Sequence, residues 1–208
     1  MNHEEVNDAP HVFVMCKAPV AGRVKTRLMT LYSAGEACDI HRAMAETVIE
    51  RAARLFFNVS IAADDISHPF FERFGLPVVE QGEGDLGARM SRLMRQAFDE
   101  GAGSVLFLGT DSPHMAESRL ADVVARLGDH DVVIGPVADG GYDLIAMSKP
   151  APELFEGIAW GSEHVLRQSL ERAKGSGVSV ALLDQSFDLD TPESLERVKA
   201  LWQPPLSV

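Results

Sequence analysis

The sequence predicts an α/β fold in which a mostly parallel β-sheet carries helices on both of its faces. Short, wholly apolar runs such as Val12-Phe13-Val14-Met15-Cys16 are typical of strands that are buried on both faces. Between them lie longer segments with apolar residues three or four positions apart, which indicate amphipathic helices. Because the two patterns alternate along the chain, they favour βα units and a parallel sheet.

The expected elements follow one another without a linker rich in Gly, Ser or Pro and without an internal repeat. Strands are predicted at 12–16, 57–61, 105–108, 131–134, 142–147 and 178–183, and helices at 37–55, 86–98, 120–127, 162–174 and 191–202. The last helix has the clearest start, because Thr191 can cap it, Pro192 suits its first turn and Glu193 is favoured by its dipole. One domain is expected over residues 11–203, with an N-terminal arm at 1–10 and a tail at 204–208.

Composition narrows the class of protein. Of 208 residues, 46% are apolar and 24% charged, a balance typical of globular chains, and the formal charge of −12 argues against nucleic-acid binding, which needs a basic surface. No apolar run reaches membrane-spanning length, and the acidic N-terminus does not fit a secretory signal. Cys16 and Cys38 have no metal-type spacing and suggest no disulfide framework, so a cytoplasmic location is expected. The oligomeric state stays open.

In open α/β sheets ligands bind at the carboxyl ends of the strands, so the residues that follow each strand are the candidates for chemistry. The segment 17–27, after the first strand, carries four cations in an otherwise acidic chain, and Gly22 allows a tight turn there. Such a loop, leading into a helix, could bind a diphosphate; the alternative is a solvated basic loop. The spacing matches neither a Walker loop nor a dinucleotide fingerprint.

Two aspartates are candidate metal ligands. Asp111 follows the strand at 105–108 in the segment Gly109-Thr110-Asp111-Ser112-Pro113, and Asp190 follows the last strand. Carboxylates suit Mg²⁺ or Mn²⁺, ions that are commonly held by one or two carboxylates together with substrate phosphates. Each aspartate could instead serve only as an acid at a helix start. We expect the pair to bind one divalent ion opposite the cationic loop.

Other polar segments are candidates for the walls of the pocket. Residues 81–90 place small residues before a helix, where a base or sugar could approach the backbone, although glycines also serve plain turns. The segment Asp139-Gly140-Gly141-Tyr142 follows another strand and fits a wall of a polar pocket. Trp160 could stack on a sugar, and Glu163 or His164 could take an acceptor's proton. The alternative for these three is a structural role.

These segments together, from Lys17-x-Pro19-x-x-Gly22-Arg23-x-Lys25-Thr26-Arg27 to Asp188-x-Asp190-Thr191-Pro192-Glu193, resemble a bacterial family of predicted glycosyltransferases, some linked to arsenosugar synthesis. Their fold is the A-type nucleotide-diphospho-sugar transferase (GT-A) fold, a three-layer α/β/α sandwich. The resemblance implies metal binding by Asp111 and Asp190. It implies a nucleotide and phosphate site made of Lys17, Pro19, Gly22, Arg23, Lys25, Arg27, Asp85, Leu86 and Arg89, to which the segment 81–90 adds Gln81 as a candidate. It also implies an acceptor or sugar pocket around Asp139, Gly140, Gly141 and Tyr142, and Trp160, Glu163 and His164 are further candidates for this pocket.

The expected function is metal-dependent transfer from a nucleotide-activated donor to a small acceptor, with Arg23, Lys25 and Asp111 as the catalytic residues. The leading version transfers a sugar from a nucleotide-diphospho-sugar. Glycosyltransferases of the fold usually carry Asp-x-Asp, whereas Asp111-Ser112-Pro113 has one Asp, which also resembles guanylyltransferases that act on phospholactate or molybdopterin. The alternatives are therefore nucleotidyl transfer from an NTP to a phosphorylated acceptor, and nucleotide binding without catalysis.

Overall fold

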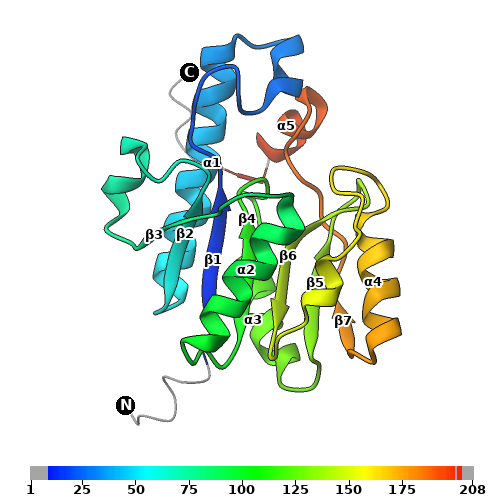
Figure 1. The fold of residues 1–208 in the computed structure, drawn as a ribbon. Helices are drawn as coiled ribbons and strands as arrows, with labels where there is room; N and C mark the ends of the chain where they lie inside the picture. Colours follow the sequence, from blue (N-terminus) through cyan, green and yellow to red (C-terminus); the bar gives the residue numbers. More distant parts are fainter. Residues whose placement is uncertain (1–8, 200, 203–208) are drawn as a thin grey trace.

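A seven-stranded sheet in the order β3-β2-β1-β4-β6-β5-β7 forms the centre of the molecule (Figure 1). The computed structural model describes residues 9–199 and 201–202. All strand pairs are parallel except those that β6 forms with β4 and β5. The strands are β1 (His11–Cys16), β2 (Val59–Ala63), β3 (Val78–Glu80), β4 (Val105–Gly109), β5 (Val132–Pro136), β6 (Tyr142–Met147) and β7 (Val180–Leu182).

Helices cover both faces of the sheet, which confirms the predicted α/β class and its mostly parallel sheet (Figure 1). Alternate residues of β1 show why: Val12 and Val14 pack toward α1 and α3, whereas Phe13 packs toward α2 and α4. The helices are α1 (Ala34–Leu55), α2 (Leu86–Asp99), α3 (Glu117–Leu127), α4 (Val165–Ser176) and α5 (Pro192–Lys199), with short 3-10 helices η1 (Thr26–Thr30), η2 (Pro69–Phe74) and η3 (Pro152–Phe155).

A separate apolar cluster attaches the C-terminal segment to the start of the chain. Leu195, Val198 and Trp202 pack against residues of α1 and against Leu28 of η1. The indole Nε1 of Trp202 donates a hydrogen bond to Thr47 Oγ1 at 3.1 Å. This cluster brings the segment that precedes α5, including Asp190, beside the loop that follows β1.

Several boundaries differ from the sequence prediction for local reasons. The second strand begins at Val59, because Phe57 points into solvent and is 90% exposed. The first helix begins at Ala34, since Ser33 and Glu36 form a reciprocal capping box. The three-residue strand β3 was not predicted. The last helix was predicted to reach Trp202, whereas α5 ends at Lys199 and Trp202 lies beyond it. The expected arm at 1–10 and tail at 204–208 fall largely or wholly outside the described residues.

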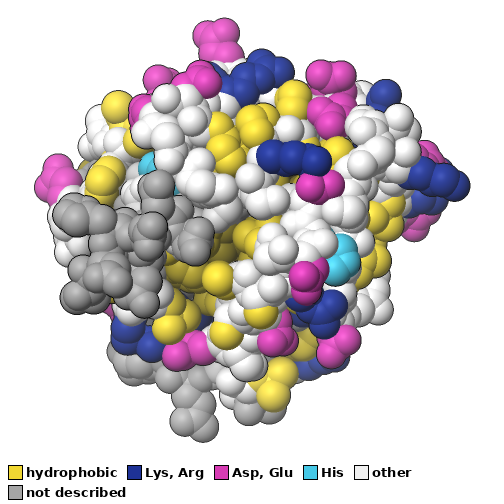
Figure 2. Space-filling view, turned by 90° about the horizontal axis from the view of Figure 1, so that it is seen from below, with side chains coloured by type: hydrophobic (Ala, Val, Ile, Leu, Met, Phe, Trp, Pro, Cys, Tyr) yellow, Lys and Arg dark blue, Asp and Glu magenta, His cyan; other side chains and the backbone are white. Residues whose placement is uncertain are grey.

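Figure 2 shows the molecule from below, the end of the sheet away from the carboxyl end of β1; acidic and basic side chains are interspersed on this face. Within residues 9–199 and 201–202, no helix combines the length and the apolar character that crossing a membrane requires.

Candidate functional site

A cleft of about 640 Å³ lies at the carboxyl ends of β1 and β4. The loop after β1, the start of α2 and the turn after β4 form its walls, and Asp190 reaches it from the segment before α5. The cleft collects most of the residues that the sequence singled out: Lys17, Arg23, Lys25, Arg27, Gln81, Asp85, Leu86, Arg89, Asp111, Tyr142, Trp160 and Asp190. Residues as far apart in the chain as Met15 and Asp190 therefore share one concave site.

Asp111 and Asp190 are brought together, as the prediction of a shared site requires, and the ammonium of Lys25 lies between them. Lys25 Nζ is 2.7 Å from Asp111 Oδ1 and 2.7 Å from Asp190 Oδ1, and it also donates to the carbonyl of Leu189. Only 4% of the Lys25 side chain is exposed. A backbone hydrogen bond also joins the segment before α5 to the turn after β4, because Leu189 N donates to Asp111 O at 2.8 Å.

The charges in this group stabilise one another. Burial alone would lower the pKa of Lys25, but the carboxylates of Asp111 and Asp190 outweigh burial and raise it. Removal from water would raise the pKa of Asp111, yet the adjacent Lys25 ammonium dominates and lowers it. Arg27 approaches the other oxygen of Asp190 at 3.4 Å. The ammonium of Lys25 and the carboxylate of Asp111 therefore each favour the charged form of the other.

The oxygen atoms around Lys25 Nζ are of the chemical type that binds divalent cations. Two carboxylate oxygens and one backbone carbonyl already converge on a positive group, and hard oxygen ligands of this type suit Mg²⁺ or Mn²⁺. Among the described residues, no three His, Cys, Asp or Glu side chains gather to hold a metal by themselves. Such a site would need substrate oxygens to complete its coordination, as is usual for Mg²⁺ at phosphate groups.

The start of α2 uses its polar groups largely within the protein. Gln81, which is 4% exposed, donates to Ala62 O at 2.8 Å and accepts from Arg89 Nη1 at 3.1 Å. Arg89 also donates to Gly84 O at 2.9 Å, and Asp85 caps the helix by accepting from Ala88 N at 2.8 Å. These bonds fix the guanidinium of Arg89 at the wall of the cleft.

Two further groups, one in the cleft and one in a pocket beside it, were missed by the sequence analysis. His41 of α1 is 4% exposed, donates from Nε2 to Lys17 O at 2.9 Å, and has its pKa lowered by burial. Its neutral ring therefore holds the first residue of the cationic loop. The apolar spacing of α1 gave no reason to separate His41 from its core neighbours, whereas Asp64 could have been found, because it directly follows the strand β2.

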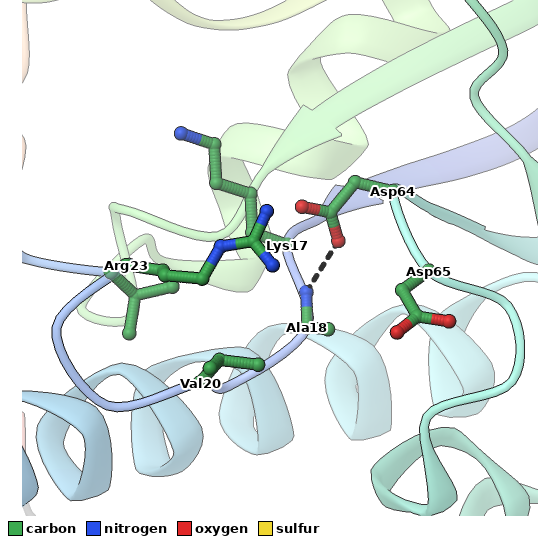
Figure 3. Close-up of a pocket in the computed structure, with 7 residues that line it drawn as sticks. Lys17, Ala18, Val20, Arg23, Asp64 and Asp65 are labelled. Atoms are coloured by element: carbon green, nitrogen blue, oxygen red, sulfur yellow. Dashed lines mark hydrogen bonds between the residues drawn. The ribbon is translucent and has the colours of Figure 1, made fainter.

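Asp64 belongs to a second pocket, of about 350 Å³, that adjoins the cleft and shares Lys17, Arg23 and Val24 with it (Figure 3). Asp64 Oδ1 accepts from Ala18 N at 2.7 Å, and Asp65 lies next to it. The carboxylate of Asp64 thus anchors the first turn of the loop from the side of β2. Arg23 reaches across this pocket from the other end of the loop (Figure 3).

Other predicted residues do not line the cleft: Pro19, Gly22, Asp139, Gly140, Gly141, Glu163 and His164. Gly22 has a φ of +81°, which fits the predicted tight turn. The side chains of Glu163 and His164 are 80% and 49% exposed, and they lie 3.9 Å from each other, between His164 Nδ1 and Glu163 Oε1. Of the aromatic residues, Tyr142 and Trp160 do reach the cleft and pack edge to face, with ring centroids 6.2 Å apart.

Gly87 explains how Trp160 reaches this position. A Cβ at Gly87 would lie 2.7 Å from Trp160 Nε1 and 2.5 Å from the carbonyl of Phe155. Within the described residues, Trp160 Nε1 is buried without a hydrogen-bond partner. The small residue in the segment Gly84-Asp85-Leu86-Gly87 therefore admits the indole to the wall of the cleft.

Gly140 has a structural role, and replacing it with alanine is expected to destabilise the fold. Its φ is +89°, and a Cβ there would come within 2.2 Å of Glu163 O. We expect Gly140→Ala to lower the free energy of unfolding by about 2–3 kcal/mol, measured by urea denaturation. Gly141→Ala is the matched control, because its nearest contact is the Asp139 carboxylate at 3.2 Å. Equal losses in the two variants would contradict this interpretation.

The stability of the protein should also depend on Asp188. Burial, together with the charges of Asp139, Asp190 and Asp111, raises the pKa of Asp188 to about 6. The folded state therefore holds this proton more tightly than the unfolded chain, and the resulting stabilisation, complete below pH 4, disappears as the pH rises through 6. The free energy of unfolding of wild type should therefore fall between pH 4.5 and pH 7.5, whereas that of Asp188→Asn should lack this fall. The difference between variant and wild type should shift by about 1–2 kcal/mol in favour of the variant over this range, measured by urea denaturation. A constant difference across that range would contradict the shift.

The fold and the cleft define the class: the chain has the architecture of nucleotide-diphospho-sugar transferases and cytidylyltransferases. It aligns with the crystal structure of a candidate nucleotide-diphospho-sugar transferase from Desulfovibrio desulfuricans G20 with a TM-score of 0.80 and 30% identity, over 86% of this chain and 81% of that one. The synthetase of CMP-2-keto-3-deoxy-manno-octonic acid, solved with CTP, shares the fold at a TM-score of 0.61 and 14% identity, over 93% and 98% of the two chains.

The chain belongs to the DUF2064 family of uncharacterised proteins conserved in bacteria, whose family model matches residues 44–162. This confirms the predicted resemblance to a bacterial family of this fold. A further relative is the 2-phospho-L-lactate guanylyltransferase of Methanocaldococcus sp. (strain FS406-22), 27% identical over 135 residues. That alignment covers 58% of this chain and 57% of the relative, so the chain spans little more than half of that protein's length.

Proposed function

We propose that this protein is a metal-dependent transferase that binds the phosphates of a nucleotide donor in the cleft at the ends of β1 and β4. The observation that carries the proposal is the meeting of Asp111 and Asp190 around one cation, beside the exposed side chains of Lys17, Arg23 and Arg27. Charges of both signs are needed to hold a phosphate–metal complex, and they gather here in a chain with a net charge of −12.

Residues at different places in the cleft would bind different parts of the donor. Lys17, Arg23 and Arg27 are exposed at the rim and would bind phosphate oxygens, and Lys25 would stabilise the negative charge that develops on the departing group. Asp111 and Asp190 would hold Mg²⁺ or Mn²⁺, which when bound neutralises the phosphates and polarises the bond that breaks. Gln81, Asp85, Leu86 and Arg89 would contact the nucleoside end of the donor.

Nucleotidyl transfer is the version we favour. An oxygen of a phosphorylated acceptor would bond to the α-phosphorus of an NTP while the bond from that phosphorus to the β-phosphate oxygen breaks, so that pyrophosphate leaves. The support is the guanylyltransferase relative and the single acid of Asp111-Ser112-Pro113.

Glycosyl transfer is the second candidate, favoured by one observation: Tyr142 and Trp160 form an aromatic wall of the cleft, and aromatic rings can pack against sugars. An acceptor oxygen would then bond to the anomeric carbon of a nucleotide-diphospho-sugar, the bond to the phosphate oxygen would break, and a nucleoside diphosphate would leave. The resemblance to nucleotide-diphospho-sugar transferases supports this version.

The two versions differ in their products. The purified protein would be incubated with Mn²⁺ and either NTPs with phosphorylated small acceptors or UDP- and GDP-sugars with hydroxyl acceptors, and pyrophosphate and nucleoside diphosphates would be measured. Pyrophosphate that appears only with an acceptor present supports nucleotidyl transfer, whereas release of a nucleoside diphosphate supports glycosyl transfer. Calorimetric binding of nucleotides without either product would instead indicate a non-catalytic nucleotide-binding protein.

A further inference from the structure

We propose that Lys25 closes the divalent-cation site in the nucleotide-free protein, so that the protein takes up the ion together with the nucleotide and not before it. This inference rests on the proposed function, because it assigns a regulation to the same site. The position between the Oδ1 atoms of the two aspartates is held by an ammonium that belongs to the chain itself.

Distance makes the two cations mutually exclusive. Lys25 Nζ is 2.7 Å from an oxygen of each aspartate and bonds to Leu189 O as well. Mg²⁺ binds oxygen ligands at about 2.1 Å, so an ion shared by the same two oxygens would overlap the ammonium. The side chain of Lys25 must therefore leave this position before the Oδ1 atoms of Asp111 and Asp190 can share an ion.

Burial decides when Lys25 can leave. Only 4% of its side chain is exposed, and its three oxygen partners replace water around the ammonium. A free ion would take over these oxygens, and the ammonium would lose its two carboxylate partners with no anion to replace them, which is unfavourable. The phosphates of a nucleotide, bound by Lys17 and Arg23 at the same loop, would offer the ammonium new anionic partners. Ion and nucleotide binding should therefore favour each other.

The backbone conformation of Lys25 is also unusual. Its φ is 47°, and it is the one non-glycine residue with a positive φ in the part of the chain that the structure describes. Left-handed backbone is unfavourable for a residue with a side chain and persists where surrounding contacts enforce it. The bonds to Asp111, Asp190 and Leu189, together with the turn in which Leu28 N donates to Lys25 O at 2.9 Å, hold this conformation. The unfavourable backbone of Lys25 is therefore retained at the position where its ammonium meets the two aspartates.

The test measures binding of Mn²⁺ alone by equilibrium dialysis, without nucleotide or activity. Lys25→Met keeps the length of the side chain and removes its charge, and we expect it to bind Mn²⁺ at least tenfold more tightly than wild type. Lys149→Met is the matched control, because it removes the same charge from an exposed pair with Asp131 at 2.8 Å, and its affinity should equal that of wild type. The gain should disappear in the double variant Lys25→Met with Asp111→Asn. Equal Mn²⁺ affinity of wild type and Lys25→Met would overturn the inference.

A second measurement covers the case in which Lys25→Met does not fold. Wild type would be dialysed against Mn²⁺ with and without inorganic pyrophosphate, correcting for the Mn²⁺ that pyrophosphate binds in solution. We expect pyrophosphate to raise the amount of Mn²⁺ bound at limiting concentration by tenfold or more. Tight Mn²⁺ binding to wild type without pyrophosphate would overturn the inference and leave the proposed function standing. Absence of Mn²⁺ binding under both conditions would overturn the inference together with the metal role in the proposed function.

Discussion

Asp111→Asn is expected to lower kcat/KM of the transfer reaction by about 10³-fold, the scale typical of removing one group that stabilises developing charge. The neutral amide keeps the shape of the side chain but loses the charge that faces Lys25 and would bind the divalent ion. The melting temperature should change little, because the side chain of Asp111 is 46% exposed and Lys25 keeps Asp190 as a partner.

The control for this prediction is Asp122→Asn, which removes one negative charge from an exposed position on α3. It should leave both the rate and the melting temperature unchanged. If Asp111→Asn kept its rate within threefold of wild type and lost only stability, Asp111 would be a structural residue at the end of β4 and the proposed chemistry would fail.

Arg119→Met is expected to cause the largest loss of stability. Arg119 of α3 pairs with Asp143 of β6 at 3.2 Å, with side chains only 13% and 2% exposed, and it also donates to Asp184 O. Removing the guanidinium leaves a buried carboxyl without its charged partner, which should lower the free energy of unfolding by about 3 kcal/mol at pH 8. For a chain of this size that corresponds to a fall in Tm of roughly 6–12 °C.

The loss should be smaller at pH 5. Burial raises the pKa of Asp143 to about 6 although Arg119 opposes the shift, so removing Arg119 raises the pKa further. At pH 5 the carboxyl is then mostly protonated in both proteins and no unpaired charge is buried, whereas at pH 8 the variant must bury a charge or take up a proton. Arg126→Met, on the exposed side of the same helix, is the control. Equal losses at pH 5 and pH 8 would contradict this account.

Much of the fold could be predicted because local patterns coincide with tertiary packing. The runs at 12–16 and 105–108 are buried on both faces, so their apolar character is continuous, and Leu144–Met147 of β6 form a similar run after Asp143. The strand β3 has only three residues, and its apolar part, Val78-Val79, is too short to indicate a strand without the pairing with β2. Short strands of this kind depend on the neighbouring strand and not on their own sequence.

The meeting of Asp111 and Asp190 could be predicted for a topological reason, since both follow strands that end near the same edge of the sheet. The position of Lys25 between them could not, because it depends on a left-handed backbone at a residue that rarely adopts one. The same limit applies to Gln81, whose amide is largely occupied by backbone carbonyls and Arg89. Residue type indicated the chemistry of these side chains, and three-dimensional contacts determined which of them remain free for a ligand.

The central claim is that Asp111 and Asp190 hold a metal–nucleotide complex against the cationic loop. The most direct test is a crystal structure of the protein with Mn²⁺ and a nucleotide that it binds, using the anomalous signal of manganese. The account predicts one anomalous peak in contact with carboxylate oxygens of both aspartates, with the Lys25 ammonium moved onto a phosphate. A nucleotide bound in this cleft with Lys25 still seated between Asp111 and Asp190, and no manganese there, would contradict it.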